Sequence, residues 1–111
     1  MTKEDYIMID FNKRNGNSYN IYDWMMTKLD LTCSGLFVYA KIYDTSSKGK
    51  DFIGSINYLR RCTNTSKSTV IRVLKDLVEK GYIIKAVKQI DGKDVVTYRH
   101  NEEILKEIGV N

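Results

Sequence analysis

The 111-residue sequence predicts an α+β fold in which a helical core is followed by a β-hairpin. Apolar residues recur at helical spacing up to Gly81, and from Tyr82 onward the pattern changes to runs of β-forming residues. Asp91 and Gly92 between these runs form a dipeptide that is typical of tight hairpin turns. A short polar turn joins the last two helices of the core. The sequence therefore predicts a winged helix-turn-helix, with a three-helix core, a C-terminal hairpin as the wing and an N-terminal extension.

The length suits one domain and leaves no room for two. We expect an N-terminal extension over residues 1–31 packed on the core, the winged helix-turn-helix domain over 32–101, and a short C-terminal helix or tail over 102–111. No apolar run approaches the roughly 20 residues that cross a bilayer, and the first residues lack a signal-peptide pattern. The sequence predicts a cytoplasmic protein without a membrane partner.

The N-terminal extension carries weaker signals than the rest of the chain. Residues 6–11 predict a short strand, and the polar stretch 12–20 contains a turn signal at Asn15 and Gly16. Residues 21–31 space their apolar side chains as a short helical segment would. We expect Trp24 in this segment to clamp the extension onto the core.

Three helices are predicted in the core. Residues 32–34 can cap the first, and the run 36–43 is apolar on nearly every side, which predicts a buried central helix. A short extended piece at 52–54 follows. Ser55 offers an N-cap for the second helix, whose apolar residues up to Cys62 have helical spacing.

The third helix has the clearest boundaries. Ser66 is a typical N-cap after the polar turn at 63–65, and Lys80 followed by Gly81 is typical of a helix end. Its apolar stripe, expected in the core, consists of Val70, Val73, Leu74, Leu77 and Val78. We also expect Tyr39, Tyr43 and Tyr58 to pack with their hydroxyls in water.

Positive charge is concentrated on the helix-turn-helix and the hairpin. The chain carries a net charge of +4, and residues 60–99 contribute +6 while the remainder contributes −2. Such a concentration is typical of a surface that binds a polyanion. In helix-turn-helix units the second helix enters the major groove of DNA. The residues predicted to contact double-stranded DNA are Arg60, Arg61, Ser66, Lys67, Ser68, Thr69, Arg72, Lys75, Lys88 and Lys93.

The chemistry of these side chains supports the prediction. The first turn of the third helix offers free N–H groups, a partial positive charge and small hydroxyls, and Arg72 could reach a phosphate or a guanine. Arg60 and Arg61 could hold the backbone beside the groove, and the wing lysines flank the hairpin tip. The plainer interpretation, a solvated basic helix face, stays open, and Lys85 and Arg99 could pair across the hairpin or with acids.

The sequence predicts neither an enzyme nor a cofactor or metal site. Cys33, Cys62 and His100 lie far apart and lack the spacing of zinc ligands. We expect the cysteines to be buried small hydrophobes and His100 to lie on the surface. There is no glycine-rich phosphate loop, and no nucleophile stands beside a base in the sequence.

From Trp24 onward the chain resembles the winged-helix domain at the start of replication initiator (replisome organiser) proteins of Gram-positive phages and mobile elements. The closest stretch is Ser66-Lys67, with Thr69-Val70-Ile71, Leu74, Leu77-Val78, Lys80-Gly81, Ile83 and Lys85. The resemblance implies DNA binding in replication or regulation. Those proteins usually continue into a second domain, so we expect either an excised domain or a stand-alone regulator or accessory factor.

Two further hypotheses concern partners. The same helix and wing could bind a protein instead of DNA, such as a host or phage replication protein, and the acids Asp76, Glu79, Asp91 and Asp94 favour this alternative. A homodimer would suit two DNA half-sites. The surfaces expected for it are the N-terminal segment with Trp24 and the C-terminal segment with Ile104, Leu105 and Ile108.

Overall fold

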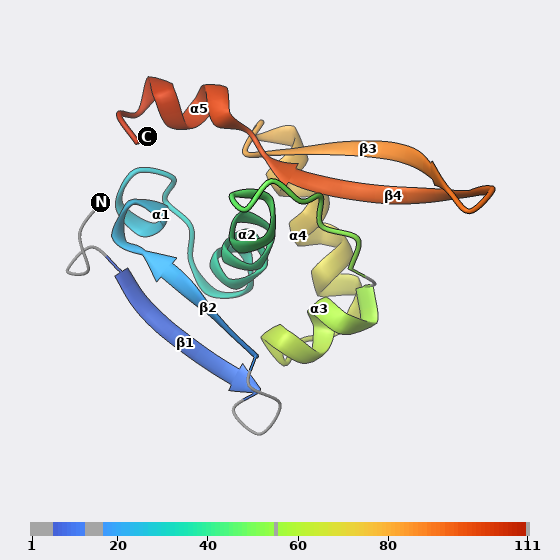
Figure 1. Cartoon of the computed structure of the whole chain (residues 1–111). Coiled ribbons are helices and arrows are strands. Elements are labelled where there is room, and N and C mark those ends of the chain that lie inside the picture. The colour runs from blue at the N-terminus through green and yellow to red at the C-terminus, as the bar shows by residue number, and fades with distance from the viewer. Residues whose placement is uncertain (1–5, 13–16, 55, 111) are drawn as a thin grey trace.

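A helical body carries one β-hairpin at each end of the chain, and the C-terminal hairpin projects from it as a long wing (Figure 1). This computed structural model describes residues 6–12, 17–54 and 56–110. The elements are β1 (Tyr6–Asn12), β2 (Asn17–Tyr22), α1 (Asp23–Thr27), α2 (Cys33–Ser46), α3 (Ile56–Thr63), α4 (Lys67–Glu79), β3 (Ile83–Ile90), β4 (Lys93–His100) and α5 (Glu102–Glu107). This order confirms the predicted α+β winged helix-turn-helix.

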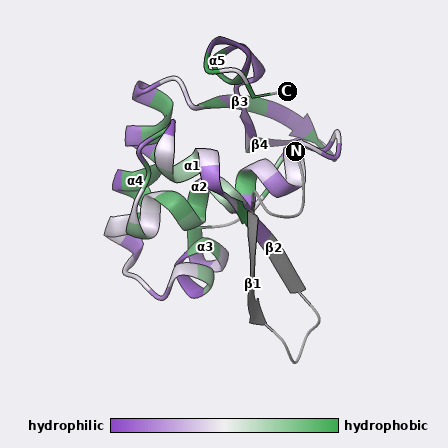
Figure 2. Ribbon diagram, turned by 90° about the vertical axis from the view of Figure 1, so that its left-hand side faces the viewer, coloured by the Kyte–Doolittle hydropathy of each residue, from purple (hydrophilic) through white to green (hydrophobic). Residues whose placement is uncertain are grey.

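The core is built around α2, which contacts β2, α3, α4 and β4. Val38, Tyr39, Ala40 and Ile42 on this helix are completely buried, as the apolar run predicts. Figure 2 shows hydrophobic residues gathered where α2, α3 and α4 meet. One continuous hydrophobic cluster extends from Ile21 to Val110. The packing of α2 therefore holds the helix-turn-helix, the base of the wing and the N-terminal segment together.

The helix-turn-helix consists of α3, a tight turn and α4. Ser66 caps α4 as predicted, because its Oγ accepts a hydrogen bond from the Thr69 N–H at 3.2 Å. Val70, Leu74 and Leu77 are buried against the core, while the rest of the predicted stripe is partly buried. Gly81 follows the helix with a φ of +77°, which a glycine adopts without strain. The predicted N-cap at residue 55 lies outside the described residues.

The wing is an antiparallel hairpin with an unbroken register from Ile83 opposite His100 to Ile90 opposite Lys93. Asp91 and Gly92 both have positive φ, as the predicted tight turn requires. At the base, Phe52 pairs with the outer edge of β4. Its N–H donates to the Tyr98 carbonyl at 2.8 Å and its carbonyl accepts the Tyr98 N–H at 3.0 Å. The short extended piece at 52–54 thus anchors the wing.

The N-terminal extension matches the prediction only in part: β1 confirms the strand predicted over residues 6–11. The polar stretch 12–20 contains most of β2, which pairs with β1 in an antiparallel register that places Tyr6 opposite Tyr22. The predicted helical segment 21–31 is helical only in α1. Pairing with β1 holds residues 17–22 extended in spite of their polar character. The turn predicted at Asn15 and Gly16 lies outside the described residues.

Trp24 is the clamp that the sequence predicts. It is 4% exposed and makes edge contacts with the rings of Tyr39 and Tyr43, at centroid distances of 6.1 and 5.1 Å. Its Nε1 has no hydrogen-bond partner among the residues that the structure describes. Tyr39 is completely buried and its pKa is raised by that burial, so the expectation of a wet hydroxyl is wrong for this residue.

The surfaces suggested for a homodimer are largely used within this chain. Trp24 and Leu105 are each 4% exposed, and Ile104 and Ile108 are partly buried against the same core. The Lys28 ammonium donates to the Ile108 carbonyl at 3.1 Å, which ties the segment after α1 to the end of α5. Trp24 and Leu105 are therefore not available to a second copy, and the homodimer itself stays a prediction.

Candidate nucleic-acid interface

The outward face of α4 carries Ser68, Arg72, Lys75 and Glu79. Their spacing of four, three and four residues places them along one side of the helix, opposite the buried stripe. All four are exposed. In the part of the chain that the structure describes, neither Arg72 nor Lys75 takes part in an ion pair. Two cations are therefore presented to solvent on the helix that follows the turn.

The hydroxyl groups at the start of α4 are hydrogen-bonded to one another in the helix cap. Ser66 Oγ lies 3.1 Å from Ser68 Oγ and 2.9 Å from Thr69 Oγ1, in addition to accepting the Thr69 N–H. Thr69 is half-buried, whereas Lys67 and Ser68 are exposed. Of the predicted residues in this turn, Lys67 and Ser68 are thus the ones best placed to meet a ligand.

Arg60 and Arg61 lie on different sides of α3. Arg61 lines a hollow of about 550 Å³ together with Ile53 and Tyr58, away from the outward face of α4. Arg60 follows Ile56 by four residues, so it lies on the side of α3 that borders α4 and the wing. Successive residues on a helix diverge by about 100°. Only Arg60 therefore stands beside the predicted interface.

The wing lysines flank the hairpin tip as the sequence predicts, and their contact with DNA stays a prediction. Lys88 pairs with the Asp51 carboxylate, which is fixed at the wing base next to Phe52. The register places Lys88 opposite Val95 and Lys93 opposite Ile90, so both lysines lie on one face of the hairpin. Lys88 thus has an acidic partner 37 positions earlier in the chain. Within the described ranges Lys93 makes no ion pair.

Lys85 and Arg99 do not pair across the hairpin as suggested. Lys85 stands opposite Tyr98, and Arg99 stands opposite Ile84 on the other face. Neither has an ion pair with any acid in the described part of the chain.

Two of the acids that favour a protein partner are already paired within the chain. Asp76 pairs with Lys80 at 3.0 Å, and Asp94 accepts a hydrogen bond from the Gln89 amide at 3.0 Å.

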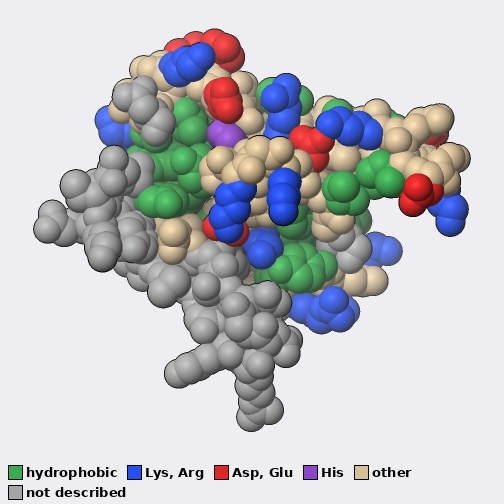
Figure 3. All heavy atoms as spheres, in the orientation of Figure 1, with side chains coloured by type: hydrophobic (Ala, Val, Ile, Leu, Met, Phe, Trp, Pro, Cys, Tyr) green, Lys and Arg blue, Asp and Glu red, His purple; other side chains and the backbone are tan. Residues whose placement is uncertain are grey.

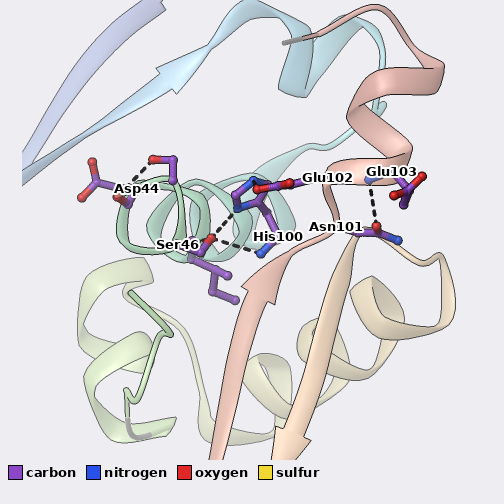
Figure 4. Close-up of polar contacts among 8 residues, drawn as sticks. Asp44, Ser46, His100, Asn101, Glu102 and Glu103 are labelled. Atoms are coloured by element: carbon purple, nitrogen blue, oxygen red, sulfur yellow. Dashed lines mark hydrogen bonds and ion pairs between the residues drawn. The ribbon is translucent and has the colours of Figure 1, made fainter. Parts of the chain in front are cut away.

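His100 is buried, contrary to the expectation of a surface residue. It is 7% exposed, because it lies between the end of α2 and the start of α5 (Figure 4). Ser46 Oγ lies 2.6 Å from His100 Nδ1, accepts the His100 backbone N–H at 3.1 Å and donates to the Ile42 carbonyl at 2.9 Å. A serine beside a histidine suggests a nucleophile and base, but these contacts use the hydroxyl to join β4 to α2. We interpret the pair as structural.

The pKa of His100 predicts a pH-dependent stability. Burial lowers this pKa, with Glu102 opposing and Arg99 reinforcing the shift. The unfolded chain, in which histidine has a pKa of about 6.5, binds more protons than the folded chain just below that value. The contribution of His100 to the free energy of unfolding should therefore be at its maximum above about pH 6.5. It should decrease as the pH falls from there towards the folded pKa.

Urea unfolding at about pH 7.5 and about pH 5.5 measures this effect. The wild-type protein should lose more stability between these two values than a His100→Gln variant, which has no titrating ring at this position. Equal losses in the two proteins would show that His100 is not the group responsible.

The described residues show no centre for metal chemistry and no membrane span. Nowhere in ranges 6–12, 17–54 and 56–110 do three or more His, Cys, Asp or Glu gather in a way that could hold a metal ion. None of the helices in those ranges is long and apolar enough to cross a membrane. Cys62 is buried as expected, whereas Cys33 is exposed because it is the first residue of α2.

Comparison with known proteins bears on the fold. No protein-family model and no curated protein matches the chain. A solved structure described as a possible transcriptional regulator from Methanosarcina mazei Go1 is similar, with a TM-score of 0.52 and 23% sequence identity over 93% of this chain and 85% of that chain. The fold is a winged helix-turn-helix. At this identity the likeness supports the arrangement of α3, α4 and the wing, and the resemblance to replication initiators stays a prediction.

Proposed function

We propose that this protein binds double-stranded DNA and places the outward face of α4 in the major groove. The observation that carries the proposal is the pair of exposed cations on this face, Arg72 and Lys75, which have no ion pair among the described residues. The helix is held rigidly by its buried stripe and is followed directly by a wing. Helices in this position carry the base contacts of helix-turn-helix proteins.

The positions of the cations suit some of them to contacts with bases and others to contacts with phosphates. Arg72 lies near the middle of the exposed face, where a guanidinium can contact the O6 and N7 atoms of guanine. Lys67 at the start of α4 and Arg60 on α3 are exposed and suited to phosphates. Glu79 near the end of the same face would repel phosphates, so the contact is confined to the first three turns of α4. With few phosphate contacts, binding should be of modest affinity, and its dependence on salt concentration should be correspondingly moderate.

The biological setting is proposed on separate grounds. The description of the structural neighbour as a possible transcriptional regulator favours a regulatory role. The resemblance of the chain from Trp24 onward to replication initiators of phages and mobile elements favours a role in replication or regulation in such an element. Both settings use the same face of α4, so one binding experiment serves them both.

Fluorescence anisotropy with a random-sequence DNA duplex over a series of salt concentrations tests the proposal. The wild-type protein should bind at low salt, and its affinity should fall as salt rises. An Arg72→Ala and Lys75→Ala double variant should bind about tenfold more weakly, with a salt slope lower by about two, because two cations are removed from the interface.

A matched control is Lys48→Ala with Lys106→Ala, which removes the same charge from exposed positions on other elements. This variant should bind nearly as the wild type does. Equal losses in the two double variants would show that overall charge, and not α4, attracts the DNA. No binding by the wild-type protein at low salt would overturn the proposal.

A further inference from the structure

A groove of about 600 Å³ runs between α4 and the wing, and its interior is apolar. Ile56, Leu74, Val78 and Tyr98 form much of its lining. Ile71, on the flank of α4 that faces the groove, is 46% exposed. Such a large aliphatic side chain next to a hollow is costly to leave in water unless something covers it.

The apolar surface continues from the groove along the wing. Val87 and Val96 stand directly opposite each other and are 63% and 41% exposed. They lie on the same face of the hairpin as Lys85 and Tyr98, which line the groove, because side chains two residues apart share a face. Figure 3 shows hydrophobic side chains on the part of the wing that projects beyond the body. Groove and wing thus form one continuous apolar surface.

DNA is a poor occupant for this surface. A phosphate placed against Val87 and Val96 would lose water without gaining a hydrogen-bond donor. The two wing lysines that the sequence offered for phosphate contact, Lys88 and Lys93, lie on the opposite face of the hairpin. The chemistry here is that of a protein interface, with an apolar centre and a charged rim.

The geometry also limits the shape of the partner. The wall on the wing side consists of side chains on the face of the hairpin, and not of free backbone groups at its edge, so an added strand could not hydrogen-bond there. A helix laid in the groove would bury its own apolar stripe against these side chains. The charged residues of the lining are Lys75 and Glu79 on α4 and Lys85 on β3, so the rim carries a net positive charge. Neither lysine has an ion pair among the residues described.

We propose that the groove between α4 and the wing binds an amphipathic helix of a partner protein, whose apolar stripe is flanked by Asp and Glu. The apolar stripe covers Ile71, Val87 and Val96, and the carboxylates meet Lys75 and Lys85. Because Lys75 also belongs to the proposed DNA face, the partner helix and DNA compete for the protein. This proposal does not depend on DNA binding, since the residues that carry it are apolar side chains away from the outward face of α4.

Two synthetic peptides test the proposal. Each has about 18 residues, roughly five helical turns, with Leu at positions i, i+3, i+4 and i+7 of each repeat. One carries Glu at the flanking positions and the other carries Lys. Titration into protein with labelled Ile and Val methyl groups, followed by NMR, should show the Leu/Glu peptide shifting the signals of Ile71, Val87 and Val96. The Leu/Lys peptide should bind at least tenfold more weakly.

Variants then separate the groove from the rest of the surface. Val87→Thr with Val96→Thr keeps β-branched residues on the wing and should weaken binding of the Leu/Glu peptide at least tenfold. The control Ile53→Thr with Ile90→Thr removes two exposed aliphatic side chains that do not line the groove and should leave peptide binding unchanged. Lys85→Glu should shift the preference from the Leu/Glu peptide towards the Leu/Lys peptide.

The outcomes distinguish this proposal from DNA binding. Shifts confined to other residues, no binding of the Leu/Glu peptide, or equal effects of the groove and control variants would overturn the proposal. It would also fail if Val87→Thr with Val96→Thr weakened DNA binding as much as the Arg72 and Lys75 double variant, because the surface would then belong to DNA. If the wild-type protein bound the Leu/Glu peptide but no duplex DNA, the groove would stand and the DNA proposal would fail.

Discussion

Replacing Trp24 by Ala is expected to lower the free energy of unfolding by about 3–5 kcal/mol. The ring is almost completely buried and touches Tyr22, Tyr39 and Tyr43, so its removal leaves a cavity between α1 and α2. A domain of this size is stabilised by only about 5–15 kcal/mol in total. The variant should therefore be close to unfolding at room temperature. Urea titration followed by far-UV circular dichroism measures the loss without relying on tryptophan fluorescence.

A Trp24→Phe variant serves as the matched control. Phe keeps a six-membered aromatic ring in the cluster but is smaller than the indole, and it removes the Nε1–H donor, which has no partner among the described residues. An unpaired buried donor costs free energy, so its loss offsets part of the lost packing. We expect Phe to lose less than half of the stability that Ala loses. A loss below about 1 kcal/mol for Ala would contradict the close packing of α1 on α2.

Replacing Gly54 by Ala is expected to destabilise the protein by about 1–3 kcal/mol, the typical cost of overpacking. A methyl group at this position would overlap the Cζ, Cε1 and Cε2 atoms of the Phe52 ring. Phe52 has little freedom to move, because it is 4% exposed and both its backbone N–H and its carbonyl are hydrogen-bonded to Tyr98. The strain should therefore reach the base of the wing. Thermal or urea unfolding gives the magnitude.

Gly35→Ala provides the comparison for this prediction. Gly35 lies in the first turn of α2, and the nearest heavy atom to a methyl group there is Leu31 Cδ2 at 4.0 Å. Ala in an unstrained helical position should stabilise by up to about 1 kcal/mol. If both alanine variants changed stability by the same amount, the close approach of Phe52 to Gly54 would not be the cause.

The elements with local signals could be predicted from the sequence. The Ser66 cap, the apolar stripe of α4, Gly81 and the Asp91-Gly92 turn each act through neighbours within about four residues, so their geometry is written into short stretches. β2 could not be predicted. Three of its six residues, Asn17, Ser18 and Asn20, have low strand propensity, and the strand is held by pairing with β1 and by the burial of Ile21.

The candidate site was predictable only in part, for the same reason. The shared face of Ser68, Arg72 and Lys75 follows from helical spacing alone. Lys88 pairs with Asp51, which lies 37 residues away in the sequence, and the buried His100 contacts Ser46, which lies 54 residues away. The alternation along β3 shows that Val87 shares a face with Lys85, but only the packing of α4 beside the wing turns that face into the wall of a groove.

The position of the chain ends has a practical consequence. The start of β1 and the end of α5 lie on the side of the body opposite the wing (Figure 1). The contact between Lys28 and the Ile108 carbonyl fixes the end of α5 to the segment after α1, so this end is held away from α4. A fluorophore, an affinity handle or a sensor surface linked at either terminus would leave α4 and the wing facing solution.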